Sequence, residues 1–223
     1  IGLLNGLKAL NRVNRLPLII SADQEGGRVT RLPPEATQFP SNLVLGSHGS
    51  SHLAYDVGLV TGVEMKAYGF NVNLAPALDI FSNQNNTVIG DRALGKTPEV
   101  VSKLGIALMK GLKDGGVIPA IKHFPGHGDT VVDSHVGLPS LQHHRKRLEQ
   151  FELVPFKEAI EHGAEMVMVA HIVFPQIAEE GLPASLSKEI ITDILRQELG
   201  FEGVIISDDM DMGAIQKNYD MEE

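Results

Sequence analysis

One short segment of this 223-residue chain concentrates side chains that can transfer protons. Residues 122–135, KHFPGHGDTVVDSH, hold three histidines, two aspartates and one lysine. Its glycines and proline disfavour a helix and predict a loop that leaves the end of a strand. Asp133 and His135 are two residues apart, which in an extended stretch places both side chains on one face. A carboxylate beside an imidazole fixes its tautomer and favours its protonated form, so His135 is a candidate general acid that later acts as a base.

Two other interpretations of this segment stay open. In the first, its histidines only form hydrogen bonds within a folded loop. In the second, the segment binds zinc, and the permissible ligands are His123, His127, Asp129, Asp133 and His135. A helix would be needed to bring His123 and His127 to one side, and the intervening proline and glycines disfavour it. We therefore expect no metal site.

A second candidate is Asp208, which follows the apolar run of residues 203–207 and is expected to point out from a strand end. Asp209, one residue further on, is expected to face elsewhere. Glycosidases need a carboxylate close to the anomeric carbon and a proton donor to the leaving oxygen, and Asp208 with His135 supplies such a pair. The alternative is that Asp208 caps the N-terminus of a helix.

Further polar residues that suit sugar hydroxyls follow other apolar runs. Asp23 stands at the end of the run 16–23, with Arg28 and Arg31 after a Gly-Gly turn, and Arg92 follows another glycine. A carboxylate can accept from two hydroxyls, and an arginine fork can reach two oxygens together. The competing explanations are surface ion pairs, among Glu25, Arg28 and Arg31 in one case and between Asp91 and Arg92 in the other. His171 suits a core position as well as a ligand contact.

The elements that must position these residues alternate between strands and helices. Five apolar runs predict buried parallel strands, at residues 16–23, 70–80, 116–124, 164–174 and 203–209. Between them, one helix is expected to begin after Thr97 with Pro98 in its first turn, and another after Ser187. This alternation is typical of an α/β fold.

The position of the ionisable residues favours a TIM-type (β/α)8 barrel over an open sheet. They stand where the apolar runs end, at Asp23, Asp79, Lys122, His123, His171 and Asp208. In a barrel the residues at the carboxyl ends of several strands converge to form the active site, whereas no glycine-rich phosphate turn of an open doubly wound sheet is present. A sixth strand is possible near residues 87–89. A closed barrel needs eight, so elements are expected to be missing at both chain ends.

Composition narrows the function classes. The net charge is −9 and the pI is about 5.5, which argues against a nucleic-acid partner. The chain has no cysteine, which excludes disulfides and thiolate chemistry. No run approaches the roughly 20 apolar residues of a membrane helix, and no leader stands at the start. A hydrophobic content of 43% suits one large domain spanning residues 1–223.

Taken in order, five motifs resemble glycoside hydrolase family 3, in particular its bacterial β-N-acetylglucosaminidases of the NagZ type. They are DQEGGRVTRL, NLAPALDI, IGDRALG, KHFPGHGDTVVDSH and ISDDMDM, and the likeness runs from residue 16 to the end. The most specific piece is GHGDTVVDSH, because β-glucosidases of this family look different there. The resemblance implies a partial catalytic barrel, without a cofactor, that cleaves terminal β-linked N-acetylglucosamine from muropeptides and related glycosides in peptidoglycan turnover.

The resemblance also assigns roles to residues. It implies Asp208 as nucleophile, and His135, supported by Asp133, as acid/base of a retaining two-step mechanism. The sugar-binding residues of the family fall on Asp23, Arg31, Arg92, Lys122 and His123. The partner is thus a small carbohydrate, and the bacterial cytoplasm is the family default, with an envelope or secreted form left open.

Three alternatives are left open by the sequence. A phosphorylase would use the same site with phosphate as acceptor, since a histidine repels an anion less than a carboxylate does. A sugar-binding barrel without catalysis is argued against by Asp208 and the intact pair of Asp133 and His135. A metal-dependent hydrolase would lose its activity with a chelator.

Overall fold

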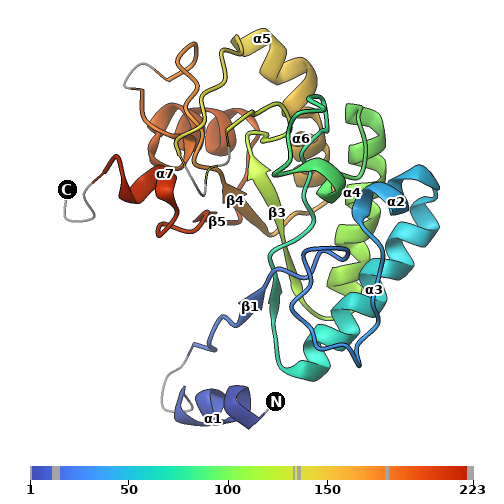
Figure 1. The fold of residues 1–223 in the computed structure, drawn as a ribbon. Helices are drawn as coiled ribbons and strands as arrows, with labels where there is room; N and C mark the ends of the chain where they lie inside the picture. Colours follow the sequence, from blue (N-terminus) through green and yellow to red (C-terminus); the bar gives the residue numbers. More distant parts are fainter. Residues whose placement is uncertain (1, 12–15, 133, 135–136, 179–180, 220–223) are drawn as a thin grey trace.

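Each of the five apolar runs supplies one strand of a parallel sheet. The computed structural model describes residues 2–11, 16–132, 134, 137–178 and 181–219. The strands are β1 (Ser21–Ala22), β2 (Val72–Asn73), β3 (Ile118–Phe124), β4 (Met166–Val169) and β5 (Val204–Ser207). Neighbouring strands follow one another in the sequence, in the order β1-β2-β3-β4-β5. Among these described strands the order never reverses, so they include no switch point, and the sheet curls in one direction as half of a barrel (Figure 1).

The α/β prediction is therefore confirmed, and a closed eight-stranded barrel remains a prediction. Helices cover the outer face of the sheet, where α3 lies along α4 and α4 contacts α6 and β3 (Figure 1). The longer helices are α1 (Gly2–Leu10), α3 (Ser51–Tyr68), α4 (Pro98–Asp114), α6 (Val154–Glu161) and η5 (Glu189–Glu198). Short helical turns complete the connections: α2 (Asn42–Ser47), η2 (Gly90–Arg92), α5 (Arg145–Arg147), η3 (Leu148–Glu152), η4 (Ala184–Leu186) and α7 (Gly213–Gln216).

The expected helix starts are found. Helix α4 begins at Pro98 directly after Thr97 and is followed by the Gly115-Gly116 pair. Ser187 accepts a hydrogen bond from the N–H of Ile190 at 3.2 Å, so it caps the first turn of η5. No helix in the described ranges is both long and apolar enough to cross a membrane.

The possible sixth strand near residues 87–89 does not form. The side-chain oxygen of Asn86 accepts the N–H groups of Val88 at 3.0 Å and Ile89 at 2.9 Å, which folds this stretch into a turn that leads into η2. The carbonyls of residues 87–89 then all face the guanidinium of Arg28. A local side-chain bond therefore overrides the apolar character of Val88 and Ile89.

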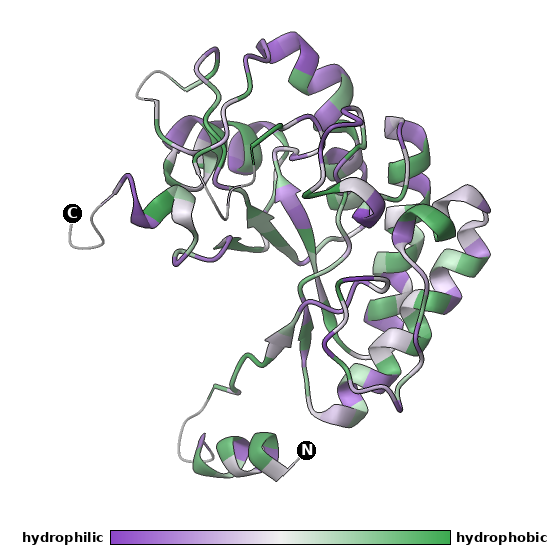
Figure 2. Cartoon of the chain, viewed as in Figure 1, coloured by the Kyte–Doolittle hydropathy of each residue, from purple (hydrophilic) through white to green (hydrophobic). Residues whose placement is uncertain are grey.

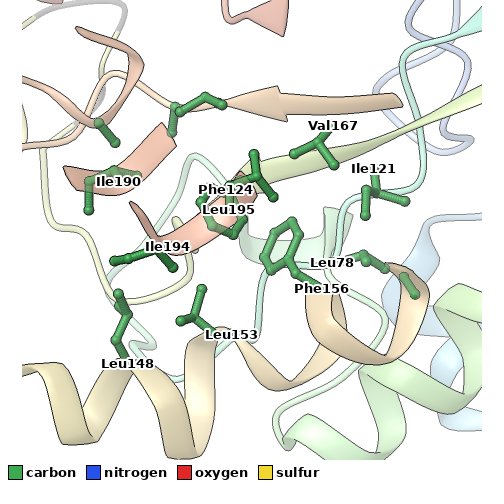
Figure 3. Packing of buried hydrophobic residues seen from close by; sticks show 14 of the residues in the cluster. Leu78, Ile121, Phe124, Leu148, Leu153, Phe156, Val167, Ile190, Ile194 and Leu195 are labelled. Atoms are coloured by element: carbon green, nitrogen blue, oxygen red, sulfur yellow. The ribbon is translucent and has the colours of Figure 1, made fainter. Parts of the chain in front are cut away.

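The main core lies between the outer face of β3 and β4 and the helices α6 and η5. Figure 3 shows Phe124 of β3 and Phe156 of α6 at its centre, with Ile194 and Leu195 of η5 beside them. The two phenyl rings meet edge to face with centroids 5.3 Å apart. Figure 2 shows β4 in hydrophobic colours over its whole length, which fits its complete burial. This core fixes β3 and β4, whose ends carry site residues.

Helices α3 and α4 approach each other so closely that only glycine fits at their contact. A Cβ added to Gly58 would lie 2.3 Å from the carbonyl oxygen of Leu108, and one added to Gly111 would lie 2.1 Å from that of Tyr55. Because the obstacles are backbone atoms, a methyl group would force the two helices apart. The close contact sets how α4 packs behind β3.

We expect Gly58→Ala and Gly111→Ala each to lower the free energy of unfolding by about 1–3 kcal/mol, the usual cost of overpacking. Gly6 of α1 is the matched control, because nothing lies within 4 Å of its added Cβ. Gly6→Ala should be neutral or slightly stabilising. Urea unfolding of the full chain measures all three, and equal stability of the Gly6 and Gly58 variants would contradict this packing.

Candidate active site

Residues at or after the ends of different strands line one polar cleft with a volume of about 590 Å³. The cleft collects all six predicted nucleophile and sugar-binding residues that the structure describes: Asp23, Arg31, Arg92, Lys122, His123 and Asp208. Asp133 and His135 lie outside the described residues. A second hollow of about 420 Å³ follows the inner face of the sheet, is lined mainly by apolar side chains and shares Asp23 and Asp208 with the cleft.

Lys122 is the most deeply buried charge of the cleft, with 1% of its side chain exposed. Its Nζ lies 2.5 Å from Oδ1 of Asp23 and 2.8 Å from Oε1 of Glu25. A buried ammonium without such partners would be strongly destabilising. The two carboxylates come from the segment after β1, so this ammonium joins the ends of β1 and β3.

Glu25 is the buried carboxylate of this cluster and contacts both Lys122 and Arg92. Arg92 holds it in a fork, with Nε 3.0 Å from Oε2 and Nη2 2.8 Å from Oε1. Burial raises the pKa of Glu25, but Lys122 and Arg92 outweigh burial and lower it to about 2. Burial lowers the pKa of Arg92, but Glu25, together with Asp79 and Asp23, outweighs burial and raises it.

The two surface ion pairs that were the competing explanations do not form as the sequence suggested. Glu25 pairs with Lys122 and Arg92 and is buried, whereas Arg28 pairs with Asp91 at 2.7 Å. The turn at Gly26-Gly27 directs Glu25 inward. Both glycines have positive φ, and the turn packs against residues 39–41. The side chain of Arg31 is exposed at the cleft and donates to the Thr30 carbonyl at 3.2 Å.

His123 reaches the cleft from the end of β3. Its Nε2 lies 3.3 Å from Nη2 of Arg92, and its Nδ1 lies 2.6 Å from Oδ2 of the buried Asp79. Four predicted or newly found site residues, Arg92, Glu25, Lys122 and His123, are therefore in contact in one continuous network. The sequence indicated Asp79 as a strand-end residue without giving it a role.

The side chain of His127 is buried within the loop segment and does not line the cleft. Its Nδ1 contacts Oγ1 of Thr130 at 2.6 Å and its Nε2 lies 3.3 Å from Oγ of Ser134. Burial, and then His123, lower its pKa to about 4, so the ring is neutral at pH 7. In the described part of the chain, no three His, Asp or Glu side chains are grouped so that they could hold a metal ion.

Asp208 stands directly after β5, and its backbone N–H donates to the carbonyl of Val169 at 2.9 Å. Burial raises its carboxyl pKa, but His123, the N–H of Asp209 and Lys122 outweigh burial and lower the pKa below the ordinary 3.8. Asp208 is therefore an ionised carboxylate at the edge of the cleft. The capping alternative is wrong, because α7 begins only at Gly213 and its N-cap is Met212.

Asp209 also lines the cleft, contrary to the expectation that it faces elsewhere. The strand ends at Ser207, so the alternation of faces does not continue to Asp209. Its carbonyl lies 3.1 Å from Nε2 of His171, and Nδ1 of that ring lies 2.6 Å from Oγ of Ser185. His171 is fully buried with both nitrogens partnered, so it is a core residue that supports the turn carrying Asp208.

Sequence reasoning missed a second histidine and aspartate pair, at the outer side of the loop. His143 Nε2 lies 2.8 Å from Oδ2 of Asp129, and its Nδ1 lies 3.6 Å from Oε1 of the buried Glu152. Arg147 pairs with the same Glu152 at 2.9 Å. No spacing signal reveals this group, because its members come from a loop and a helix that meet only in the fold.

Comparison with known proteins places this site in a family. Residues 5–223 match the glycosyl hydrolase family 3 N-terminal domain. The chain is 42% identical to beta-hexosaminidase A of Pseudoalteromonas piscicida, over 96% of the chain and 39% of that protein.

Two solved structures share the fold. A glycoside hydrolase family 3 beta-N-acetylglucosaminidase from Paenibacillus sp. is 47% identical with a TM-score of 0.95, over 98% of this chain and 42% of that one. NagZ from Neisseria gonorrhoeae, in complex with N-trifluoroacetyl-D-glucosamine, is 39% identical with a TM-score of 0.86, over 97% and 64%. The chain thus spans less than two thirds of the length of these relatives. It belongs to glycosyl hydrolase family 3, of which it carries the N-terminal domain.

Proposed function

We propose that this protein is a retaining exo-β-N-acetylglucosaminidase that hydrolyses terminal β-linked N-acetylglucosamine. The observation that carries the proposal is the ionised Asp208 at a strand end. It lies in the same cleft as Lys122 and Arg92, which are both held by carboxylates. Membership of family 3 and the names of the relatives, beta-hexosaminidase and beta-N-acetylglucosaminidase, support the reaction class. Muropeptides and related cell-wall glycosides are the proposed natural substrates.

In the first step, Asp208 attacks the anomeric carbon while His135 donates its proton to the glycosidic oxygen. The bond to the leaving group breaks and a glycosyl ester with Asp208 forms. Asp208 suits this role because its lowered pKa keeps it ionised and because the Asp209 N–H occupies only one of its oxygens, Oδ1, at 2.9 Å. In the second step, the neutral His135 takes a proton from water, whose oxygen attacks the anomeric carbon and releases Asp208.

The sugar is held by the polar wall of the cleft. Asp23, 35% exposed, can accept from two hydroxyls while Lys122 fixes its position from behind. Arg31 supplies donors from the exposed rim, and Arg92 supplies them from the floor, where the His123 ring lies beside it. Most of these groups are already hydrogen-bonded to one another, so little ordering is needed when the sugar binds.

A mechanism-based trap tests the nucleophile. A 5-fluoro N-acetylglucosaminyl fluoride slows both steps, but its good leaving group lets the first one proceed, so an ester should accumulate on Asp208 of the full chain. Peptide mass spectrometry locates the adduct. The Asp208→Asn variant should take no label and should lose activity by on the order of 10⁴-fold or more, as expected for a nucleophile. An adduct elsewhere would refute the assignment, and turnover without any adduct would point to attack by the substrate's own acetamido group.

Substitution of His135 should distinguish substrates by their leaving groups. His135→Ala should slow glycosides with poor leaving groups by roughly 10²–10⁴-fold, the usual contribution of general acid catalysis. Activated aryl glycosides need little protonation, so their first step should be nearly unaffected. Kinetics on a series of aryl N-acetylglucosaminides measures this, and an equal loss for all members would contradict an acid role. Release of sugar 1-phosphate in phosphate buffer, instead of free sugar, would identify a phosphorylase.

The pH profile of kcat/KM should be bell-shaped. Asp208 must be ionised, and because its pKa is lowered from 3.8, activity should persist to below pH 3.8 and fall only as the pH drops through the lowered value. His135 must be protonated for the first step, so activity should fall above about pH 7. In His135→Ala the basic limb should vanish for activated substrates. A rate that stays flat through the titration range of histidine would reject the role of His135.

A further inference from the structure

We propose that Asp79 is a positioning residue that ties the orientation of His123 to the start of the loop that carries His135. The inference rests on the proposed function for its catalytic consequence but not for its geometry. Asp79 is completely buried and does not line the cleft. Because it does not line the cleft, its action must pass through the groups that it holds.

One carboxylate holds donors from two points of the loop segment. Its Oδ2 lies 2.6 Å from Nδ1 of His123, and its Oδ1 accepts the backbone N–H of His127 at 2.7 Å. The N–H of His123 also faces both oxygens, at 3.3 and 3.4 Å. Burial raises the pKa of Asp79, but His123 and His127 outweigh burial and lower it. Both oxygens are therefore available as acceptors.

The contacts of His123 decide its tautomer. The guanidinium of Arg92 has only donors, so its Nη2, 3.3 Å from Nε2 of His123, requires a lone pair on that nitrogen. The ring proton then sits on Nδ1 and is donated to Asp79. Asp79 thus makes His123 present an acceptor toward Arg92 and the cleft.

The first turn of the loop rests on the segment that follows Asp79. A Cβ on Gly128 would lie 1.8 Å from the carbonyl oxygen of Ile80, so the two backbones are in direct contact. Asn86 donates to the carbonyl of His127 at 2.7 Å. The N–H and the carbonyl of His127 are therefore both held from this segment, which fixes where the loop leaves the sheet.

Asparagine cannot replace Asp79 in this role. It has the size of aspartate, but one of its two terminal atoms is a donor, so either the His123 ring or the His127 N–H would face another N–H. Asp129→Asn is the matched control: it removes the same charge from the same loop, but its partner is His143 on the outer side.

The test is ¹⁵N NMR of the full chain labelled at histidine, with the His123 signals assigned by their loss in His123→Asn. The wild-type ring should show a protonated Nδ1 and an unprotonated Nε2, and Asp79→Asn should change this pattern while Asp129→Asn leaves it intact. Asp79→Asn should bind N-acetylglucosamine at least tenfold more weakly than wild type, a loss of about 1.4 kcal/mol in binding free energy. Asp129→Asn should bind it with an affinity within about twofold of wild type. A wild-type ring protonated at Nε2 would overturn the proposal, and this result does not depend on whether Asp79→Asn folds.

Catalysis supplies the second arm. Asp79→Asn should slow substrates with poor leaving groups more than activated ones, and this selectivity should disappear in a His135→Ala background, where only the binding loss remains. Equal effects on both substrates would overturn the link to the loop. If the trap fails to label Asp208 while the NMR pattern and the binding loss are found, the proposed function fails and the positioning role of Asp79 for His123 stands.

Discussion

The site depends on the ion pairs between the buried ammonium of Lys122 and the carboxylates of Asp23 and Glu25. A lysine with 1% exposure loses nearly all its hydration, and only the two carboxylates at 2.5 and 2.8 Å offset that loss. Those carboxylates, Asp23 and Glu25, belong to the segment after β1, while Lys122 belongs to β3. The strand between them, β2, contributes only two residues to the sheet. The charge cluster therefore fixes the geometry at this end of the sheet, where few backbone hydrogen bonds do so.

The same cluster determines the electrostatics of the cleft. Glu25 is shared by Lys122 and Arg92, so its negative charge balances part of two positive ones. The N–H of Asp209 and the charge of Lys122 act against the burial of Asp208, whose pKa stays below its ordinary value. A carboxylate that is ionised but only lightly hydrogen-bonded suits a nucleophile, since strong donors to both oxygens would weaken its attack. Structural support and chemical activation thus come from the same buried groups, with Asp79 extending the network from His123 to the loop.

The sequence was sufficient to predict the five strands of the sheet, helices α4 and η5 and most of the cleft, because these depend on local signals. Apolar runs predicted the five strands of the sheet, and the polar residues at the ends of these runs pointed to Asp23, Lys122, His123 and Asp208. The failures were at turns and in pairing. An Asn86 side chain turned an apolar stretch away from strand geometry, and the end of β5 at Ser207 cancelled the expected direction of Asp209. The pairing of Glu25 with Lys122 and Arg92, like that of His143 with Asp129, joins distant segments, and single-sequence spacing carries no signal for such contacts.

The central claim is that Asp208 and His135 act on opposite ends of one breaking bond. A crystal structure of the full chain with an intact, non-hydrolysable N-acetylglucosaminide in the cleft measures this directly. The account predicts an Asp208 oxygen about 3–3.5 Å from the anomeric carbon, in line with the bond to the leaving group, and His135 within hydrogen-bond reach of the glycosidic oxygen. A sugar bound with its anomeric carbon away from Asp208, or with another side chain at the glycosidic oxygen, would contradict it.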